Sequence, residues 1–309
     1  MKGIRAADIA DGALRTFGRN AVELFVPYFF VGLATGGIIA AAQSVSPFAA
    51  LRLSPPSAFF SLRFPIPLRD LQLFLLLEFV VLISTNVLRA FLIGAVAYFG
   101  LRRFRGEEVS FGDAFKVGLR RLRQIVVGSL ILVLITGGLG WAPLYPLIVG
   151  ISTHDPLLTL VGIAGLAVVL PISIYLGVAL ALYAPVIMLE PLGAIASLRR
   201  SWELTRGRRG SIFGAQFLLG LLSGAVGVPI VLSTTFLQSP YATVAAEAIL
   251  SGIIGSWSVL ISAVAYDLIV RPRMPHYPQP PWPTSGPPAS AAWGPPAPSR
   301  GPPSSPPPG

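Results

Sequence analysis

Six long apolar runs alternate with five polar stretches along this chain. The runs cover residues 21–43, 71–100, 125–150, 157–189, 212–237 and 245–270. Each run reaches or exceeds the about 20 residues that an α-helix needs to cross the hydrocarbon core of a bilayer. Because that core holds no water, a helix that satisfies its own backbone is the spanning form favoured for runs of this length. The pattern predicts an all-α fold, with a six-span transmembrane helical bundle over residues 1–273.

Composition supports this class: 53% of the residues are hydrophobic and 12% are charged, against about 25% charged in soluble domains. The first run is too long for the apolar region of a signal peptide and carries Glu23 and Pro27, so we expect it to be retained. The chain contains no cysteine, which excludes disulfides and thiolate metal sites.

The positions of the basic residues predict the orientation. Of 23 lysines and arginines, 19 lie in residues 1–20, in alternate polar loops and in the tail. The opposite loops hold only Arg52, Arg63 and Arg69, and Arg89 lies inside a run. The positive-inside rule then places both termini in the cytoplasm of a cell-membrane protein. No aromatic-rich binding module accompanies the arginines, so we expect no nucleic-acid partner.

Three basic amphipathic stretches each precede a pair of runs, which forms a weak internal repeat. Ser110 and Asp113 supply a helix N-capping pattern in the second stretch. In the third, helical spacing places Ile195, Leu198 and Trp202 on one face, with arginines elsewhere. We expect all three helices to be interfacial, lying in the inner headgroup layer with the apolar face down, so the lipid bilayer is itself a partner.

Glycines recur at matching offsets in the third and fifth runs, and a proline follows each pair. These residues are Gly137, Gly140 and Pro143, and Gly224, Gly227 and Pro229. One interpretation is close helix packing, for which Gly220-x-x-x-Gly224 is a typical pattern. The other is a pair of broken helices that line a solute site. Packing is favoured, because glycine and proline are common in membrane helices.

Residues 190–209 read Glu-Pro-Leu-Gly-Ala-Ile-Ala-Ser-Leu-Arg-Arg-Ser-Trp-Glu-Leu-Thr-Arg-Gly-Arg-Arg, and Ile212-Phe213-Gly214 follows. This segment resembles the signature of a poorly characterised prokaryotic membrane family, related to the membrane domain attached to some glycerophosphoryl diester phosphodiesterases. The resemblance is close over about 25 residues and looser over residues 1–273. It implies a six-helix membrane domain without the enzyme, because the phosphodiesterase is a separate soluble domain.

Charged and polar residues within or near the ends of the runs form a candidate intramembrane cluster: Glu78, Asn86, Arg89, Glu23, Glu190 and Asp267. A mid-span arginine is costly by about 2.5–3.5 kcal/mol, so this stripe of the second run should face the bundle interior. Glu78 and Arg89 lie about 16 Å apart along a helix and cannot pair. We expect Arg89 to bond to Glu23, Glu190 or Asp267. A structural lock is favoured over a gate or ion relay.

A second candidate set, for anionic lipid headgroups, comprises Arg199, Arg200, Trp202, Arg206, Arg208 and Arg209. A solvated, orientation-setting face is the favoured alternative. From Pro275 onward, 15 of 35 residues are proline. This composition predicts that residues 274–309 form a disordered cytoplasmic tail, with P-x-x-P spacings that suit a protein partner.

The inventory of reactive residues argues against catalysis. The two histidines, His154 and His276, fall on opposite membrane faces in the predicted topology, and no metal-ligand spacing is present. We therefore expect no catalytic residues, metal, cofactor or enzyme activity. Two functions remain open: a membrane-organising or partner-binding component, and a transporter of small solutes or ions that uses broken helices and intramembrane charges. The loop-side features favour the first.

Overall fold

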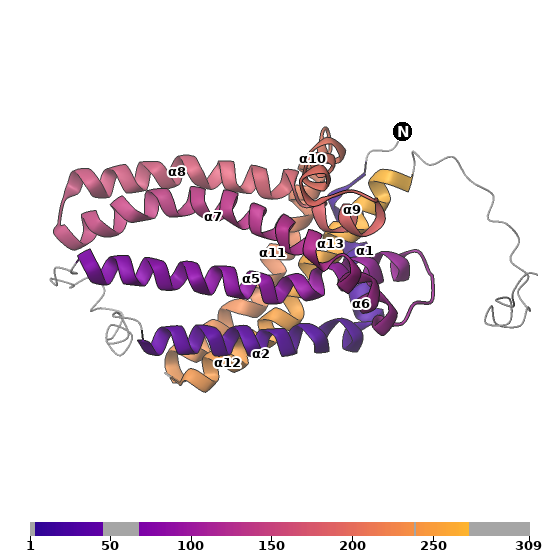
Figure 1. Cartoon of the computed structure of the whole chain (residues 1–309), viewed down its shortest axis with the longest axis horizontal. Helices are drawn as coiled ribbons and strands as arrows, with labels where there is room; N and C mark the ends of the chain where they lie inside the picture. The colour runs from indigo at the N-terminus through magenta and orange to yellow at the C-terminus, as the bar shows by residue number, and fades with distance from the viewer. Residues whose placement is uncertain (1–3, 46–67, 238, 272–309) are drawn as a thin grey trace, which may run out of the picture. The chain divides into compact units, whose positions relative to one another are not determined.

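The computed structural model describes residues 4–45, 68–237 and 239–271. Helices joined by short turns make up these residues, and no β-strand occurs among them (Figure 1). The predicted all-α class is therefore confirmed. The tail predicted over residues 274–309 lies outside the described part of the chain.

Six stretches of the described chain are helical, long and apolar enough to cross a membrane. The first three are α2 (Ala21–Val45), α5 (Leu68–Phe104) and α7 (Leu122–Thr153). The fourth is divided into α8 (Pro156–Ala179) and α9 (Tyr183–Leu189), and the fifth is α11 (Arg209–Leu237). The sixth joins α12 (Pro240–Leu250), the π-helix η1 (Ser251–Gly255) and α13 (Ser256–Val270). The six apolar runs therefore correspond to six membrane-length helical stretches.

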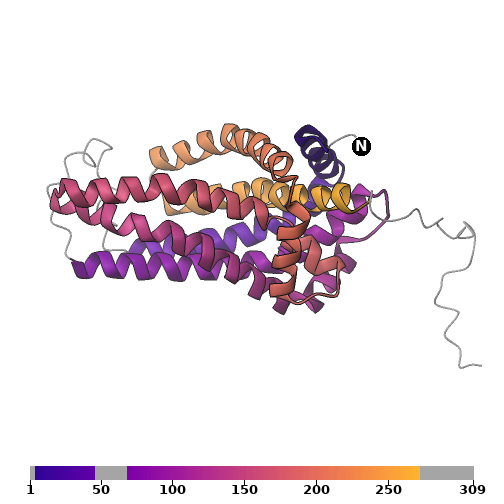
Figure 2. The same cartoon turned by 90° about the horizontal axis from the view of Figure 1, so that it is seen from above.

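Three short helices lie toward one end of this bundle: α1 (Ala6–Arg19), α6 (Phe111–Arg120) and α10 (Ala194–Thr205) (Figures 1 and 2). Each precedes two membrane-length stretches, as the internal repeat predicts. At the start of α6, the Asp113 amide donates to the Ser110 hydroxyl at 3.1 Å, which confirms the predicted N-cap. Hydrogen bonds from Ser110 and Lys116 hold the pKa of the exposed Asp113 carboxyl below its usual value.

The short helices pack against the bundle itself. Ile9 and Ala13 of α1 are fully buried, and α1 contacts α11 and α13. On α6, a Cβ added to Gly118 would lie 2.9 Å from the backbone nitrogen of Ala95 in α5. The small residues of these helices therefore serve close contact with the long helices, in addition to any contact with a membrane surface.

The sixth stretch is the centre of the core. Within its most apolar window 67% of the residues are buried, against 6% in the fourth stretch. α13 packs against α1, α2, α5 and α9, and its Leu260 and Ile269 are among the large, fully buried side chains. The fourth stretch instead exposes leucines and isoleucines, as a helix that faces lipid must.

Two glycines of α2 allow it to approach α12 closely. A Cβ added to Gly32 would lie 2.6 Å from the Cα of Ala248, and one added to Gly36 would lie 3.0 Å from the Cα of Val244. Both neighbouring atoms belong to backbone, which cannot move aside as a flexible side chain can. This Gly-x-x-x-Gly pair brings Thr35, between the two glycines, against the adjacent face of α12.

The glycines of the third and fifth runs differ in their packing: a Cβ built at Gly137 would lie 3.4 Å from Leu82 of α5, and one built at Gly227 would lie 3.5 Å from Leu250 of α12. Within the described residues, nothing lies within 4 Å of a Cβ built at Gly220 or Gly224, so the packing interpretation is wrong for this pair. Helices α7 and α11 also continue through Pro143 and Pro229. The helical geometry changes elsewhere: a turn follows Ala179 in the fourth stretch, and the π-helix η1 interrupts the sixth.

Helix α10 hydrogen-bonds to the backbone of the turn that interrupts the fourth stretch. Its Ser201 hydroxyl donates to the Ala179 carbonyl and accepts from the Leu182 amide, both at 3.1 Å. The Thr205 hydroxyl also lies 3.1 Å from the Ala179 carbonyl. Ala179 and Leu182 are fully buried, and buried backbone groups without hydrogen-bond partners are costly. Two small hydroxyl side chains therefore stabilise the turn between α8 and α9.

Candidate functional site

A cleft of about 360 Å³ opens between α2, α5 and the sixth stretch. Its walls combine charged, hydroxyl-bearing and aliphatic side chains. The lining residues are Tyr28, Arg89, Ile93, Glu247, Leu250, Ser251, Ile254, Gly255, Ser258 and Val259. A concave, mostly apolar site with a few polar groups is typical of small-molecule binding.

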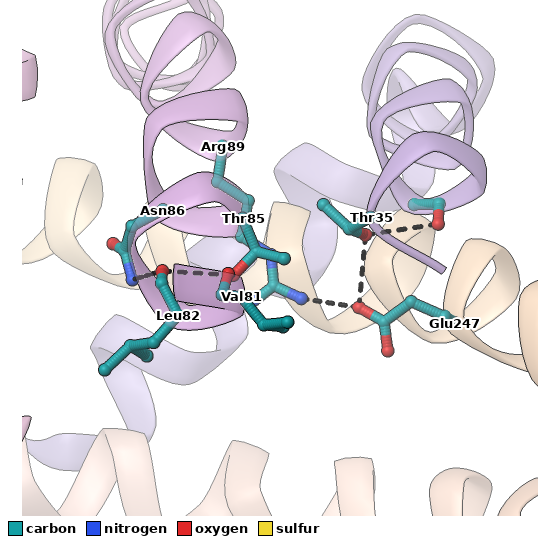
Figure 3. Close-up of polar contacts among 8 residues, drawn as sticks. Thr35, Val81, Leu82, Thr85, Asn86, Arg89 and Glu247 are labelled. Atoms are coloured by element: carbon teal, nitrogen blue, oxygen red, sulfur yellow. Dashed lines mark hydrogen bonds and ion pairs between the residues drawn. The ribbon is translucent and has the colours of Figure 1, made fainter. Parts of the chain in front are cut away.

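An ion pair crosses this cleft (Figure 3). Arg89 Nη2 of α5 donates to Glu247 Oε1 of α12 at 2.5 Å. The Thr35 hydroxyl of α2 lies 3.4 Å from the same carboxylate oxygen and 3.1 Å from the Gly32 carbonyl of its own helix. Both charged side chains remain accessible, with 43% of Arg89 and 22% of Glu247 exposed. The pair therefore joins three helices without being sealed inside them.

The predicted partner of Arg89 is wrong. Arg89 bonds to Glu247, and to none of Glu23, Glu190 and Asp267. The three predicted carboxylates lie where α2 begins, where α9 ends and near the end of α13. Arg89 lies 15 residues before the end of α5, which is about 22 Å along a helix. Their depth along the bundle therefore keeps these carboxylates from Arg89.

The three predicted carboxylates have other cationic partners, at the end of the bundle where α2 begins and α13 ends. Arg105 Nε donates to the fully buried Asp267 at 2.7 Å. Arg200 Nε lies 3.3 Å from Glu190 Oε2, and Tyr266 donates to Glu190 Oε1 at 3.0 Å. Glu23 lies 3.9 Å from Arg103. The single predicted cluster is therefore two separate polar layers: the Arg89–Glu247 pair in the cleft, and this network at the end of the bundle.

The other two members of the predicted stripe do not join the pair. Asn86 donates to the Leu82 carbonyl of its own helix at 3.4 Å and points away from Glu247 (Figure 3). Glu78 has no hydrogen bond or ion pair with any residue of the described chain. The stripe on α5 thus contributes only Arg89 to the cleft.

Two buried hydroxyl groups border the same cleft without a partner. Tyr28 Oη and Ser251 Oγ make no hydrogen bond within the described chain, although the residues are only 1% and 5% exposed. Buried polar groups are usually paired, so each unpaired one needs a cause. Ser251 begins η1, and Gly255 at its end leaves room for the Tyr28 ring, since a Cβ there would lie 2.8 Å from it. Short π-helical segments often occur at functional sites.

Sequence reasoning missed Thr35, Tyr28, Ser251 and, most importantly, Glu247. Glu247 was detectable as a second carboxylate inside the sixth apolar run, besides Asp267, because intramembrane charges mark functional or pairing sites. The three carboxylates that the sequence favoured lie near the ends of their runs, at a different depth from Arg89. The hydroxyl groups carry no signal in the sequence, because serine and threonine are ordinary in membrane helices.

Most of the predicted headgroup residues have partners within the protein. Arg208 Nη1 donates to the Ile269 carbonyl at 3.2 Å, near the end of α13. The Arg209 guanidinium lies 4.2 Å from the centre of the Trp202 ring and 4.7 Å from that of Tyr175. Arg200 pairs with Glu190, as described above. These contacts give three of the five arginines a structural role at the helix ends.

The structure separates the three residues of the predicted apolar face of α10. Ile195 is 74% exposed and Trp202 38%, whereas Leu198 is buried. The face turned to the bundle is formed largely by Ser197, Ser201, Leu204 and Thr205, because the turn after Ala179 requires hydroxyl groups. Arg199 is 85% exposed and, within the described part of the chain, pairs only with Glu203, at 3.5 Å. Arg206 is also exposed. Two arginines of the set thus remain outward.

No group of three or more histidine, aspartate or glutamate side chains within the described ranges has a geometry that holds a metal ion.

A family model matches residues 5–271, which include all six membrane-length stretches and the cleft. No curated protein and no solved structure matches the chain. On the extent of the family match, the chain belongs to the family described as a domain of unknown function, DUF7847.

Proposed function

We propose that this protein binds a small polar solute in the cleft and carries it across the membrane. The observation that supports this role is the accessible Arg89–Glu247 ion pair, which lines a cleft. Both residues lie inside membrane-length helical stretches, away from the stretch ends. A pair that only fixed helix packing would be better enclosed, and buried ion pairs are in any case weak sources of stability. Intramembrane charges that face a cavity typically mark solute or ion pathways.

The test asks whether water fills the cleft. The chain contains no cysteine, so a single introduced thiol is the only site for a thiol reagent. Ser258→Cys places the thiol in the cleft. Leu221→Cys places one outside the cleft, at a position that is 58% exposed. Leu221 lies 12 residues after the start of α11, as Ser258 lies 12 residues before the end of α13. In proteoliposomes, a charged methanethiosulfonate should label the first variant and not the second.

Labelling requires a thiolate in contact with water, which a lipid-facing position lacks. If neither thiol reacts from either side of the membrane, the cleft is dry and the proposal fails. If the Ser258→Cys variant reacts, uptake of a panel of labelled solutes by the same proteoliposomes then tests transport. The required result is uptake that the Glu247→Gln variant loses while remaining folded.

The proposed location is the cell membrane, with both termini in the cytoplasm. The asymmetric distribution of basic residues supports this orientation. The three short basic helices gather at the end of the bundle that would then face the cytoplasm (Figure 1). We propose no catalytic step, since nothing in the cleft pairs a nucleophile with a base.

A membrane-organising role is the second candidate, and the outward-facing Arg199 and Arg206 of α10 support it. If these arginines bind anionic headgroups, phosphatidylglycerol should raise the melting temperature of the detergent-solubilised protein more than phosphatidylcholine does. A double Arg199→Gln, Arg206→Gln variant should lose that difference, whereas a Lys116→Gln variant should retain it. Equal effects of the two lipids on the parent protein would exclude the role.

Two finer expectations remain proposals. The resemblance of residues 190–214 to the membrane domain attached to glycerophosphoryl diester phosphodiesterases stays a prediction, and no phosphodiesterase activity is proposed from it. A protein partner for the proline-rich segment of residues 274–309 is supported by its P-x-x-P spacings alone.

A further inference from the structure

The charges that line the cleft sum to zero. Among the lining residues, Arg89 and Glu247 are the two that carry charge. The other walls are aliphatic or carry hydroxyl groups. A bound anion would therefore lie beside the Glu247 carboxylate, and a bound cation beside the Arg89 guanidinium. An anion that pairs with Arg89 is then repelled by Glu247, and a cation that pairs with Glu247 is repelled by Arg89, so in each case the second charge offsets much of the attraction.

The ion pair leaves hydrogen-bonding capacity on both partners. Only Nη2 of the Arg89 guanidinium is bonded within the described chain, although the group has five N–H donors. On Glu247, Oε1 contacts both Arg89 and Thr35, while Oε2 has no partner among the described residues. The unbonded nitrogens of Arg89 and the Oε2 atom of Glu247 therefore form a cationic site and an anionic site side by side.

A molecule that carries both an anionic and a cationic group fits this arrangement. Its anionic group can accept from the free nitrogens of Arg89, and its cationic group can donate to Glu247 Oε2. Neither protein charge loses its partner, so neither is left uncompensated in the membrane interior. The unpaired hydroxyls of Tyr28 and Ser251 add two buried polar groups at the same cleft.

The size and walls of the cleft set the rest of the ligand. About 360 Å³ is near the lower end of the range for small-molecule pockets. Ile93, Leu250, Ile254 and Val259 offer aliphatic contact. Resting on the proposed solute-binding function, we infer that the cleft selects a small zwitterion, with a carboxylate and an ammonium group close together on a compact apolar body.

The test measures protection of the Ser258→Cys thiol in the full chain. The probes are three zwitterions, glycine, leucine and glycine betaine, and two compounds matched to leucine. The first matched compound, 4-methylpentanoate, lacks the amine, and the second, 3-methylbutylamine, lacks the carboxylate. At equal concentration, at least one zwitterion should slow labelling several-fold, and the two matched compounds should not.

The Glu247→Gln change tests the charge logic directly. It removes the partner of the ammonium group and also the repulsion of an added anion. Protection by the zwitterion should therefore fall several-fold, while protection by 4-methylpentanoate should appear. Size-exclusion chromatography and the unliganded labelling rate show whether the variant is folded. If it is not, the comparison of the five compounds on the Ser258→Cys protein still decides the question.

Two results would overturn the zwitterion assignment while leaving the solute-binding function intact. In one, the cleft thiol reacts but none of the three zwitterions protects it. In the other, the matched anion or amine protects as well as leucine does. A thiol that never reacts would instead refute the proposed function itself, so the two failures are distinguishable.

Discussion

Replacing Arg89 by alanine tests whether the ion pair stabilises the bundle. Among the described residues, the change leaves Glu247 with the Thr35 hydroxyl at 3.4 Å as its one remaining partner. Removing one partner of a fully buried pair costs about 3–5 kcal/mol, whereas exposed pairs contribute about 0–1 kcal/mol. With side chains 43% and 22% exposed, this pair lies between those limits. We expect a loss of about 1–3 kcal/mol, which corresponds to a fall of about 2–12 °C in melting temperature.

The assay is a thermal-shift series on the purified protein in one detergent. Arg89→Lys should recover part of the loss, because lysine keeps the charge but lacks the planar fork. The double change Arg89→Met, Glu247→Leu should be close to the parent in stability, because it removes both charges together. Arg199→Ala is the matched control, since that arginine is 85% exposed, and its effect should stay within about 0.5 kcal/mol.

The outcomes separate the lock from the gate. If the Arg89→Ala protein is as stable as the parent, the ion pair does not stabilise the bundle, and its role as a structural lock is refuted. A double variant that is stable but transports nothing would assign the pair to solute movement. Loss of stability in the single variant, with normal uptake wherever the protein remains folded, would leave the pair as a packing element and contradict the proposed transport role.

Three further predictions concern the frame around the cleft. Gly32→Val should separate α2 from α12 and lower the melting temperature, because its Cβ would lie 2.6 Å from the backbone of Ala248. The control Gly224→Val meets no described neighbour and should be tolerated. Equal effects of the two changes would contradict the close approach of α2 and α12. Ser201→Ala should cost about 1–3 kcal/mol in the same assay, because it leaves the buried Leu182 amide unpaired, and an unchanged melting temperature would mean that water replaces the hydroxyl. Alkaline phosphatase should be active when fused after His154 and inactive after Arg105, and the reverse pattern would invert the proposed orientation.

Some features of the fold follow from the sequence because their causes are local. The lengths of the apolar runs predict six membrane-length helices, since each helix satisfies its own backbone regardless of its neighbours. The N-cap of α6 is equally local, because Ser110 bonds to an amide three residues along the chain. The basic asymmetry is likewise readable directly from the sequence, and the orientation that it predicts is the part that the fusions test.

The candidate site could not be derived in this way, because it depends on which helices meet and at what depth. Arg89 and Glu247 are separated by 158 residues, and apolar helices offer many alternative pairings with similar hydrophobic patterns. The close approach at Gly32 brings α2 and α12 together and places Thr35 beside Glu247. The sequence alone thus determined that costly charges are present in the bundle, and only tertiary packing decided which of them meet, because the packing contacts fix the relative depth of the helices.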